Sequence, residues 1–340
     1  MLSPGNDTPV RLPRVSVIVP AYNAEQTIEQ CLDALTRQTV SRETYEIIVV
    51  DDGSSDGTRA RVEARAGVRL LVQANAGPAA ARNLGVQHAQ GEIVLFTDAD
   101  CVPAEDWIER MVVPFGDEAI VGVKGAYLSH QKELVARFVQ IEYEDKYDRM
   151  AREQYIDFID TYAAGYRRDV FVAHGGFDLG FPTASVEDQE FSFRLARQGC
   201  RMVFVPAARV RHLGHAATLP AYWRKKFKIG YWKVLVHRLH PDKLIRDSHT
   251  PQILKMQILL VGLGGFGLVG GLVWPFCLWI SGVMAVLFLL TTFPFAAKAW
   301  AKDPAVAILS PGLLLVRALA LGTGFAIGLA TAFSRPSEGA

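Results

Sequence analysis

The carboxylates Asp98 and Asp100 end a stretch, residues 92–101, that reads Glu-Ile-Val-Leu-Phe-Thr-Asp-Ala-Asp-Cys. Residues 93–96 are aliphatic or aromatic, which predicts a strand buried on both faces. Two carboxylates one residue apart at the end of such a strand repel each other unless a proton or cation lies between them. Mg²⁺ or Mn²⁺ takes oxygen ligands and commonly shares them with substrate phosphates. The pair therefore predicts a metal and diphosphate site, with simple capping of a following helix as the alternative.

The composition limits the classes of protein that fit. The 340 residues carry a formal net charge of +1, so no basic excess indicates a nucleic-acid partner. Four separated cysteines without a Cys-x-x-Cys pair argue against a zinc site or a disulfide framework and fit a reducing compartment. Residues 1–14 have no long apolar core, so we expect a flexible, cytoplasmic N-terminus without a cleavable signal peptide.

Strand and helix patterns alternate along the first hundred residues. Strands are predicted at residues 15–19, 46–50, 68–73 and 93–96, with amphipathic helices between them. We expect Asn23 to cap the first helix. This order with short loops predicts a doubly wound α/β fold with a parallel sheet, whose ligands bind at the carboxyl ends of the strands. Those ends carry Asp or Asn, and none carries a dinucleotide or Walker fingerprint.

Four strings in this order resemble the family-2 glycosyltransferases of GT-A fold. They are Val-Ser-Val-Ile-Val-Pro-Ala-Tyr-Asn, Ile-Val-Val-Asp-Asp-Gly-Ser-Ser-Asp-Gly-Thr, Asn-x-Gly-x-x-x-Ala-Arg-Asn-x-Gly and Thr-Asp-Ala-Asp. The resemblance runs from about residue 15 to residue 206. It implies inverting transfer from a nucleotide-sugar, here a UDP- or GDP-sugar, with Mg²⁺ or Mn²⁺ as cofactor.

The resemblance also implies roles for single residues. Asp52 would hydrogen-bond the nucleobase, Asp100 would bind the metal, and Asp98 would bind the ribose or the metal. The nucleotide pocket would be lined by Pro20, Tyr22, Asn23 and Arg82. For Arg82 the alternative is a salt-bridged residue on the surface.

The next part of the chain is expected to complete the sugar site. A charged amphipathic helix begins near Leu134, and a strand is predicted at residues 158–164. The string Gly-Gly-Phe-Asp, which includes Gly176, resembles the turn that borders the sugar subsite in the same family. Many relatives have an asparagine where this chain has Ala163, so the resemblance does not define how the sugar is held.

Glu187 and Asp188 begin a helical pattern that Gly199 ends. Acids are common at helix starts, because the helix dipole favours them there. An inverting transferase also needs a base that accepts the proton of the acceptor hydroxyl. The Glu-Asp motif of the family maps onto this pair, with Asp188 as the base and Glu187 beside it.

Two histidines follow a predicted strand at residues 202–205 and a further short strand. A neutral imidazole of His212 or His215 could complete the metal site or contact the diphosphate. Isolated histidines are more often structural, and both interpretations stay open.

Residues 216–250 are expected to form amphipathic helices at the membrane surface, since basic residues alternate with Trp and Tyr there. Trp223 and Arg224 would help to close the active site. The segment lacks the Gln-x-x-Arg-Trp string of processive polysaccharide synthases, so a polymerase with a secretion channel is not predicted.

Residues 251–334 contain three apolar stretches, at 253–274, 276–297 and 305–333, each long enough to cross a bilayer. Arg317 within the third stretch must face protein, snorkel, or mark a helix that starts late. Lysines before the first stretch and after the second place the catalytic domain in the cytoplasm of a multi-pass protein of the inner or plasma membrane. Residues 335–340 would be a tail.

Taken together, these features predict a GT-A catalytic domain at residues 15–215 with C-terminal transmembrane helices. The predicted activity is metal-dependent, inverting transfer of a sugar to a lipid-linked saccharide or glycolipid. One alternative is a polyprenyl-phosphate glycosyl synthase, whose phosphate acceptor needs no base. The other is a non-catalytic membrane protein that binds nucleotide-sugar.

Overall fold

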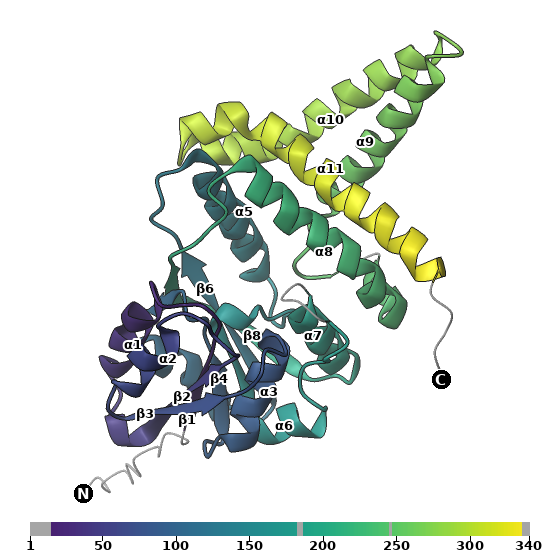
Figure 1. The fold of residues 1–340 in the computed structure, drawn as a ribbon. Coiled ribbons are helices and arrows are strands. Elements are labelled where there is room, and N and C mark those ends of the chain that lie inside the picture. The colour runs from purple at the N-terminus through teal and green to yellow at the C-terminus, as the bar shows by residue number, and fades with distance from the viewer. Residues whose placement is uncertain (1–14, 182–185, 245–246, 335–340) are drawn as a thin grey trace, which may run out of the picture.

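The computed structural model describes residues 15–181, 186–244 and 247–334 of the chain. These residues form one eight-stranded sheet, in the order β3-β2-β1-β4-β7-β6-β8-β5, with flanking helices and a C-terminal group of long helices (Figure 1). The strands are β1 (Val15–Ala21), β2 (Tyr45–Asp51), β3 (Val68–Val72), β4 (Ile93–Phe96), β5 (Cys101–Pro103), β6 (Ile120–Leu128), β7 (Ala164–Arg167) and β8 (Arg201–His212). The helices are α1 (Ile28–Thr36), α2 (Thr58–Glu63), α3 (Pro78–His88), α4 (Trp107–Val112), α5 (Leu134–Met150), α6 (Arg168–Ala173), α7 (Glu187–Arg197), α8 (Leu219–Leu239), α9 (Gln252–Gly270), α10 (Cys277–Trp300) and α11 (Pro304–Ser334). Short 3₁₀ turns are η1 (Arg42–Thr44), η2 (Val113–Gly116), η3 (Thr161–Ala163) and η4 (Pro241–Leu244).

The first half of the sheet is the parallel α/β unit that the sequence predicts. β1 pairs in parallel with β2 on one side and β4 on the other, so that Val17 lies beside both Ile47 and Leu95. The carboxyl ends of these three strands therefore meet at one edge of the sheet, together with the polar loops that follow them. Beyond β4 the sheet is mixed, because β7 runs antiparallel to both β4 and β6.

Apolar cores cover both faces of the sheet. Along β1, Val17 belongs to the core under α1 and α4, whereas Ile18 belongs to the core under α3, α6 and α7. This alternation is the period of two expected along a strand. In the second core the Phe177 ring lies 5.6 Å from Phe96 and 5.4 Å from Phe191. These contacts fix α7, and with it the carboxylates at its first turn, against the end of β4.

The strand predicted at residues 158–164 is wrong in position. This segment is irregular and ends in η3, and the strand begins only at Ala164. The backbone N–H of Ile159 donates to the Ser192 hydroxyl at 3.1 Å, and the Asp160 carboxylate pairs with buried lysines. The Ser192 side chain therefore takes a backbone N–H that a strand would use in its ladder.

Two further local predictions are corrected. β8 is one strand, where two were expected, because its pairing with β6 shifts register between Lys124 and Ala126 and the strand continues beyond the irregularity. Asn23 does not cap α1, which begins at Ile28 without a side-chain cap. Its side-chain oxygen instead accepts the backbone N–H of Ser55 at 2.9 Å, which ties the loop after β1 to the loop after β2.

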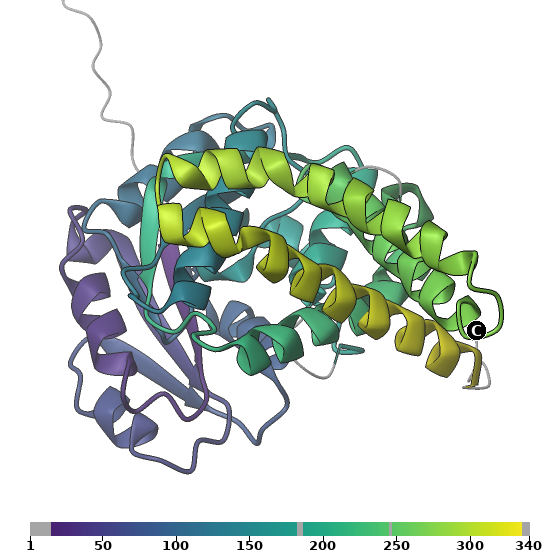
Figure 2. The same cartoon turned by 90° about the horizontal axis from the view of Figure 1, so that it is seen from above.

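The C-terminal helices α9, α10 and α11 are long and apolar enough to cross a membrane, as predicted. α9 and α10 form a hairpin that extends away from the sheet (Figure 1), and seen from above the three helices lie over one end of the domain (Figure 2). In α9 and in α10, only 11% of the most apolar 18-residue stretch is buried. In α11 the buried share of the corresponding stretch is 50%. α11 therefore joins the apolar helices to the rest of the protein, chiefly through contact with α8.

Candidate active site

A single arginine joins the two carboxylate motifs. Arg82 of α3 is buried, with 3% of its surface exposed, and donates to Asp98 Oδ1 at 2.7 Å and Glu187 Oε1 at 3.3 Å. Charge-assisted bonds of this kind are strong where water is scarce. Arg82 is thus salt-bridged, but it is not the surface residue of the alternative interpretation. It holds the loop after β4 against the first turn of α7.

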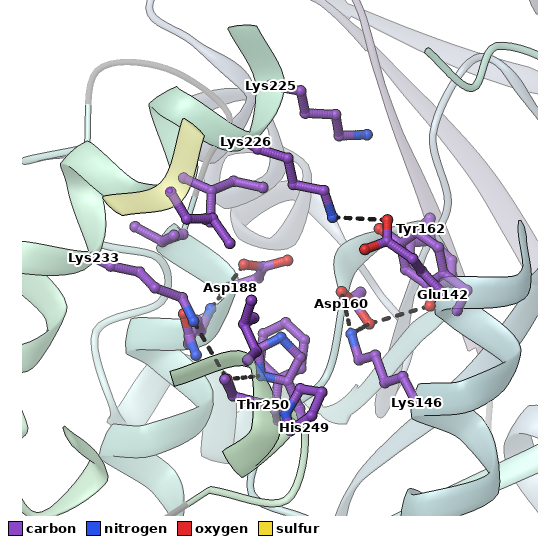
Figure 3. A pocket seen from close by; sticks show the side chains of 18 of the residues that line it. Glu142, Lys146, Asp160, Tyr162, Asp188, Lys225, Lys226, Lys233, His249 and Thr250 are labelled. Atoms are coloured by element: carbon purple, nitrogen blue, oxygen red, sulfur yellow. Dashed lines mark hydrogen bonds and ion pairs between the residues drawn. The ribbon is translucent and has the colours of Figure 1, made fainter. Parts of the chain in front are cut away.

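Asp188 lines the same pocket as Arg82 and Asp98. The pocket has a volume of about 320 Å³, and Asp188 projects into it (Figure 3). Burial raises the pKa of Asp188 well above its ordinary value, the Glu187 carboxylate adds to the rise, and Arg82 opposes it. A carboxylate with a raised pKa accepts a proton more readily at neutral pH than an exposed aspartate. A base role for Asp188 is compatible with this environment and stays a prediction.

Asp100 and His212 lie close together in the structure. Cys101 in β5 pairs with His212 at the end of β8, and His212 Nε2 lies 3.6 Å from Asp100 Oδ2. One ligand atom from each of these three side chains lies within 4.8 Å of the others. Burial raises the pKa of the Cys101 thiol well above its ordinary value, which disfavours the thiolate form that binds metals.

The donor set fits a divalent cation. A carboxylate oxygen with an imidazole nitrogen suits Mn²⁺ better than Mg²⁺, which prefers oxygen ligands alone. Asp98 is engaged by Arg82, so its expected contact with metal or ribose stays a prediction. His215 lies outside the group of ligand atoms, and its ring stacks on the rings of His212 at 5.1 Å and Tyr143 at 6.0 Å.

Asp52 is held by the loop that precedes α3. Its Oδ1 accepts from Gln73 Nε2 at 2.7 Å and from the backbone of Ala76 at 2.8 Å, and its Oδ2 accepts from Gly77 at 2.9 Å. A carboxylate has about four acceptor positions, so these bonds leave capacity for a ligand. The structure thus shows a role in shaping the loop, and contact with a nucleobase stays a prediction.

The other predicted binding residues lie in three places. Pro20 and Tyr22 are at the carboxyl end of β1, where the Tyr22 side chain is exposed. Gly176 has φ +65° and packs on Asn83, so it shapes the turn before Phe177. Trp223 and Arg224 are not among the residues that line the described pocket. Their contacts with substrate stay predictions.

The opposite wall of the pocket comes from α8 and α5. Lys225, Lys226, Lys228 and Lys233 of α8 line it, and Figure 3 shows Lys226, Lys233 and Lys146 on different sides of Asp188. Lys226 pairs with Glu142 of α5 at 3.1 Å, and Glu142 also pairs with Arg317 of α11 at 2.9 Å. Arg317 therefore faces protein, which settles the alternatives that the sequence leaves open.

Sequence reasoning missed a buried charge network beside the base. Asp160 binds Lys146 at 2.9 Å and also pairs with Lys124, whose side chain donates to Tyr162 at 3.0 Å. Burial lowers the pKa of Lys124 to about 7, against the pull of Asp160. One sequence signal could have revealed this network. Lys124 and Asp160 are each a single charged residue within an apolar segment, and a buried charge needs a partner.

The first half of the chain matches a known protein family. Residues 16–175 match the model of glycosyl transferase family 2. The chain contains a glycosyl transferase family 2 domain. Glycosyltransferase AglE of Haloferax volcanii is 44% identical over 106 residues, which are 30% of this chain and 35% of AglE. A second relative is EpsH of Bacillus subtilis (strain 168), which is provisionally named a glycosyltransferase. It is 29% identical over 226 residues, which are 63% of this chain and 64% of EpsH. The chain thus spans less than two thirds of either relative.

A solved structure resembles the family-2 domain and the helices together. It is the mannosyltransferase PcManGT from Pyrobaculum calidifontis in complex with GDP-Man and Mn²⁺, at a TM-score of 0.56 and 24% identity. The alignment covers 97% of this chain and 89% of PcManGT. At this identity the likeness concerns the fold, a Rossmann-like GT-A domain with a mixed sheet followed by apolar helices.

Proposed function

We propose that the protein is a membrane-anchored, metal-dependent, inverting glycosyltransferase. It moves a sugar from a UDP- or GDP-sugar to a hydroxyl of a lipid-linked acceptor at the cytoplasmic face of the membrane. The Arg82 bridge supports this proposal, because it joins the Asp98 motif to the Glu187 motif in a pocket that Asp188 also lines. The glycosyltransferase relatives, and the complex of PcManGT with GDP-Man and Mn²⁺, support a nucleotide-sugar donor.

Asp188 has the central role in the proposed reaction. Its carboxylate accepts the proton of the acceptor hydroxyl while that oxygen forms a bond to the anomeric carbon. The bond from the anomeric carbon to the diphosphate oxygen breaks, and the nucleoside diphosphate leaves with the bonding electrons. Attack from the face opposite the leaving group inverts the anomeric configuration. Arg82 positions Asp188 indirectly, by fixing Glu187 at the start of the same helix.

Asp100 and His212 would hold the divalent cation, with Asp98 beside them. When bound, the ion would neutralise charge that develops on the diphosphate leaving group. Because one donor is an imidazole, we expect Mn²⁺ to support the reaction at lower concentration than Mg²⁺.

Nucleoside diphosphate release by the full-length protein in detergent tests the proposal. The assay contains a panel of UDP- and GDP-sugars, Mn²⁺ or Mg²⁺, and a membrane lipid extract. Metal-dependent release with one donor, lost in both Asp100→Asn and Asp188→Asn, is the expected result. Nucleotide-sugar binding without release in any lipid extract would favour the non-catalytic alternative.

A second candidate has one specific observation in its favour, the lysines of α8 that line the pocket. They suit a phosphate acceptor, as in a polyprenyl-phosphate glycosyl synthase. A phosphate oxygen is already ionised and needs no base, so transfer that survives in Asp188→Asn would favour this candidate over the hydroxyl acceptor.

A further inference from the structure

The pocket that contains Asp188 reaches the apolar helices. Leu254 of α9, Phe295 of α10 and Leu321 of α11 are among the residues that line it. The exposed surfaces of α9 and α10 beyond it are also apolar, with Leu259 61% exposed. A molecule that occupies the whole pocket therefore meets a base at one end and hydrocarbon at the other.

The lysines of α8 lie between these two ends. From Lys225 to Lys233 the helix advances about 12 Å. Lys225 lies at the donor end, since its charge acts on Asp100 and His212. Lys233 lies at the end near α9, where its Nζ is 3.3 Å from the hydroxyl of Thr250 (Figure 3).

Lys233 differs from the other buried lysines of the pocket. Lys226 faces Glu142 at 3.1 Å and Lys146 faces Asp160 at 2.9 Å, whereas Lys233 has no ion-pair partner within 4.0 Å in the part of the chain that is described. Burial lowers the pKa of Lys233 to about 8, with the more distant charge of Asp247 opposing the shift. A partly buried ammonium without a counterion destabilises the fold, and a bound anion would offset that cost.

The groups around Lys233 match phosphate. Thr250 and Arg149 also line the pocket, where Arg149 pairs with Asp145. Burial and the positive charges of Lys146 and Lys233 lower the pKa of His249. Ammonium, guanidinium and hydroxyl donors are the groups that bind phosphate oxygens, and such charge-assisted bonds are about twice as strong as neutral ones. The neighbouring Leu254 provides the start of an apolar path.

We propose that Lys233 and Thr250 bind the phosphate or diphosphate of a lipid acceptor. The hydrocarbon chain leaves past Leu254 and Leu321 toward the bilayer, and the sugar end lies toward Asp188. This inference rests on the proposed function, because it names the chemical class of the acceptor for the same site. The acceptor is a lipid phosphate rather than a neutral glycolipid.

Binding of three probes with one hydrocarbon chain tests the inference. Geranylgeranyl phosphate, geranylgeranyl diphosphate and geranylgeraniol are titrated into the full-length protein in neutral detergent, and affinity is measured by thermophoresis. The phosphate-bearing probes should bind about tenfold more tightly than the alcohol, or more. Lys233→Met should abolish this difference and Lys233→Arg should keep it. Lys132→Met, at an exposed position outside the pocket, is the matched control and should behave as wild type.

Several results would overturn the inference. These are equal affinity for alcohol and phosphate probes, or a preference that survives in Lys233→Met. Inorganic diphosphate that binds as tightly as the lipid probes, with affinity lost in Lys233→Met, would assign the site to a soluble anion and refute the lipid assignment. The assay needs no turnover, so its outcome is separate from that of the proposed function. Wild-type protein that prefers lipid phosphate but transfers no sugar would refute the enzyme while supporting the site.

Discussion

The two sides of the active site balance charge differently. On the donor side, formed by the loops after β1, β2 and β4 with Arg82, the protein supplies its own partners. Arg82 has two carboxylates, and Asp52 accepts three hydrogen bonds. On the acceptor side, formed by α8 beyond Lys225 with α5 and residues 247–250, Lys228 and Lys233 have no ion-pair partner within 4.0 Å among the described residues.

This difference indicates that the donor side is organised before substrate binds, whereas the acceptor side is suited to bind an anionic ligand. Donor-side groups that are already bonded to one another hold their geometry before substrate arrives, which lowers the reorganisation needed in the reaction. Acceptor-side cations without partners gain most when an anionic ligand arrives. Substitutions on the donor side should therefore damage catalysis and stability together, and those on the acceptor side should damage binding.

Asp188→Asn should have the largest effect of any single substitution. The amide cannot accept the proton of the acceptor hydroxyl, so transfer should fall by about 10²- to 10⁴-fold. Release of nucleoside diphosphate with saturating donor measures this, and Glu118→Gln, an exposed acid remote from the pocket, is the control. In the wild type, the acidic limb of the pH–rate profile should lie above the ordinary aspartate range, because burial raises the pKa of Asp188. Wild-type rates in Asp188→Asn would contradict the assignment of the base.

The same variant should be more stable than the wild type at neutral pH. A carboxyl whose pKa is raised in the folded state stabilises the fold below its unfolded pKa, and that contribution is lost as pH rises through the folded pKa. Asparagine is never ionised and can still accept the bond from the backbone of Gln189. Thermal unfolding at pH 7.5 should show a higher Tm, whereas a lower Tm would argue against the raised pKa.

Arg82→Met should combine loss of activity with loss of stability. It leaves Asp98 and Glu187 without their shared cation in a buried site, which should lower the free energy of unfolding by about 3–5 kcal/mol. The matched control is Arg59→Met, because Arg59 pairs with Glu63 on an exposed helix face, where such pairs contribute about 0.3–0.5 kcal/mol. Denaturant unfolding in detergent measures both. Equal losses for the two arginines would refute the bridging role.

The ion triad between α5, α8 and α11 should respond unequally to its members. Glu142→Gln leaves both Lys226 and Arg317 without a carboxylate and should cost about 3 kcal/mol. Arg317→Met leaves the Lys226–Glu142 pair intact and should cost about 1 kcal/mol less. The difference in unfolding free energy between the two variants is the measurement. A larger loss in Arg317→Met would show that the arginine is held by other contacts, such as its bond to Gln257 at 2.8 Å.

The strand ends of the donor side could be predicted from sequence because their determinants are local. An apolar run followed by Asp or Asn defines both the strand and its polar end, and the parallel order brings these ends to one edge. The suggestion that His212 or His215 lies near the metal site depended on the family resemblance as well. No local sequence feature indicates that β5 pairs with the end of β8.

The acceptor side could not be predicted in the same way because its determinants are contacts between distant segments. Glu142 and Arg317 are 175 residues apart, and Lys124 and Asp160 are 36 apart. The error at residues 158–164 has a related cause, since the Ile159 backbone donates to Ser192 of α7 and the Asp160 carboxylate pairs with Lys124 of β6 and Lys146 of α5. Burial of these charges depends on which helices cover them, and periodicity along the chain carries no such information.

The smallest predicted effect concerns the packing of α11 on α8. Alanine substitutions at two glycines should change the stability of the protein in opposite directions. A Cβ at Gly324 would overlap the carbonyl oxygen of Phe227, whereas a Cβ at Gly262 of α9 meets nothing within 4 Å. Gly324→Ala should therefore force the helices apart and cost about 1–3 kcal/mol. Gly262→Ala should gain up to about 1 kcal/mol from helix propensity. Thermal unfolding in one detergent compares them. If both variants shifted Tm in the same direction, close packing of α8 on α11 would not be what fixes the lysine-bearing wall of the pocket.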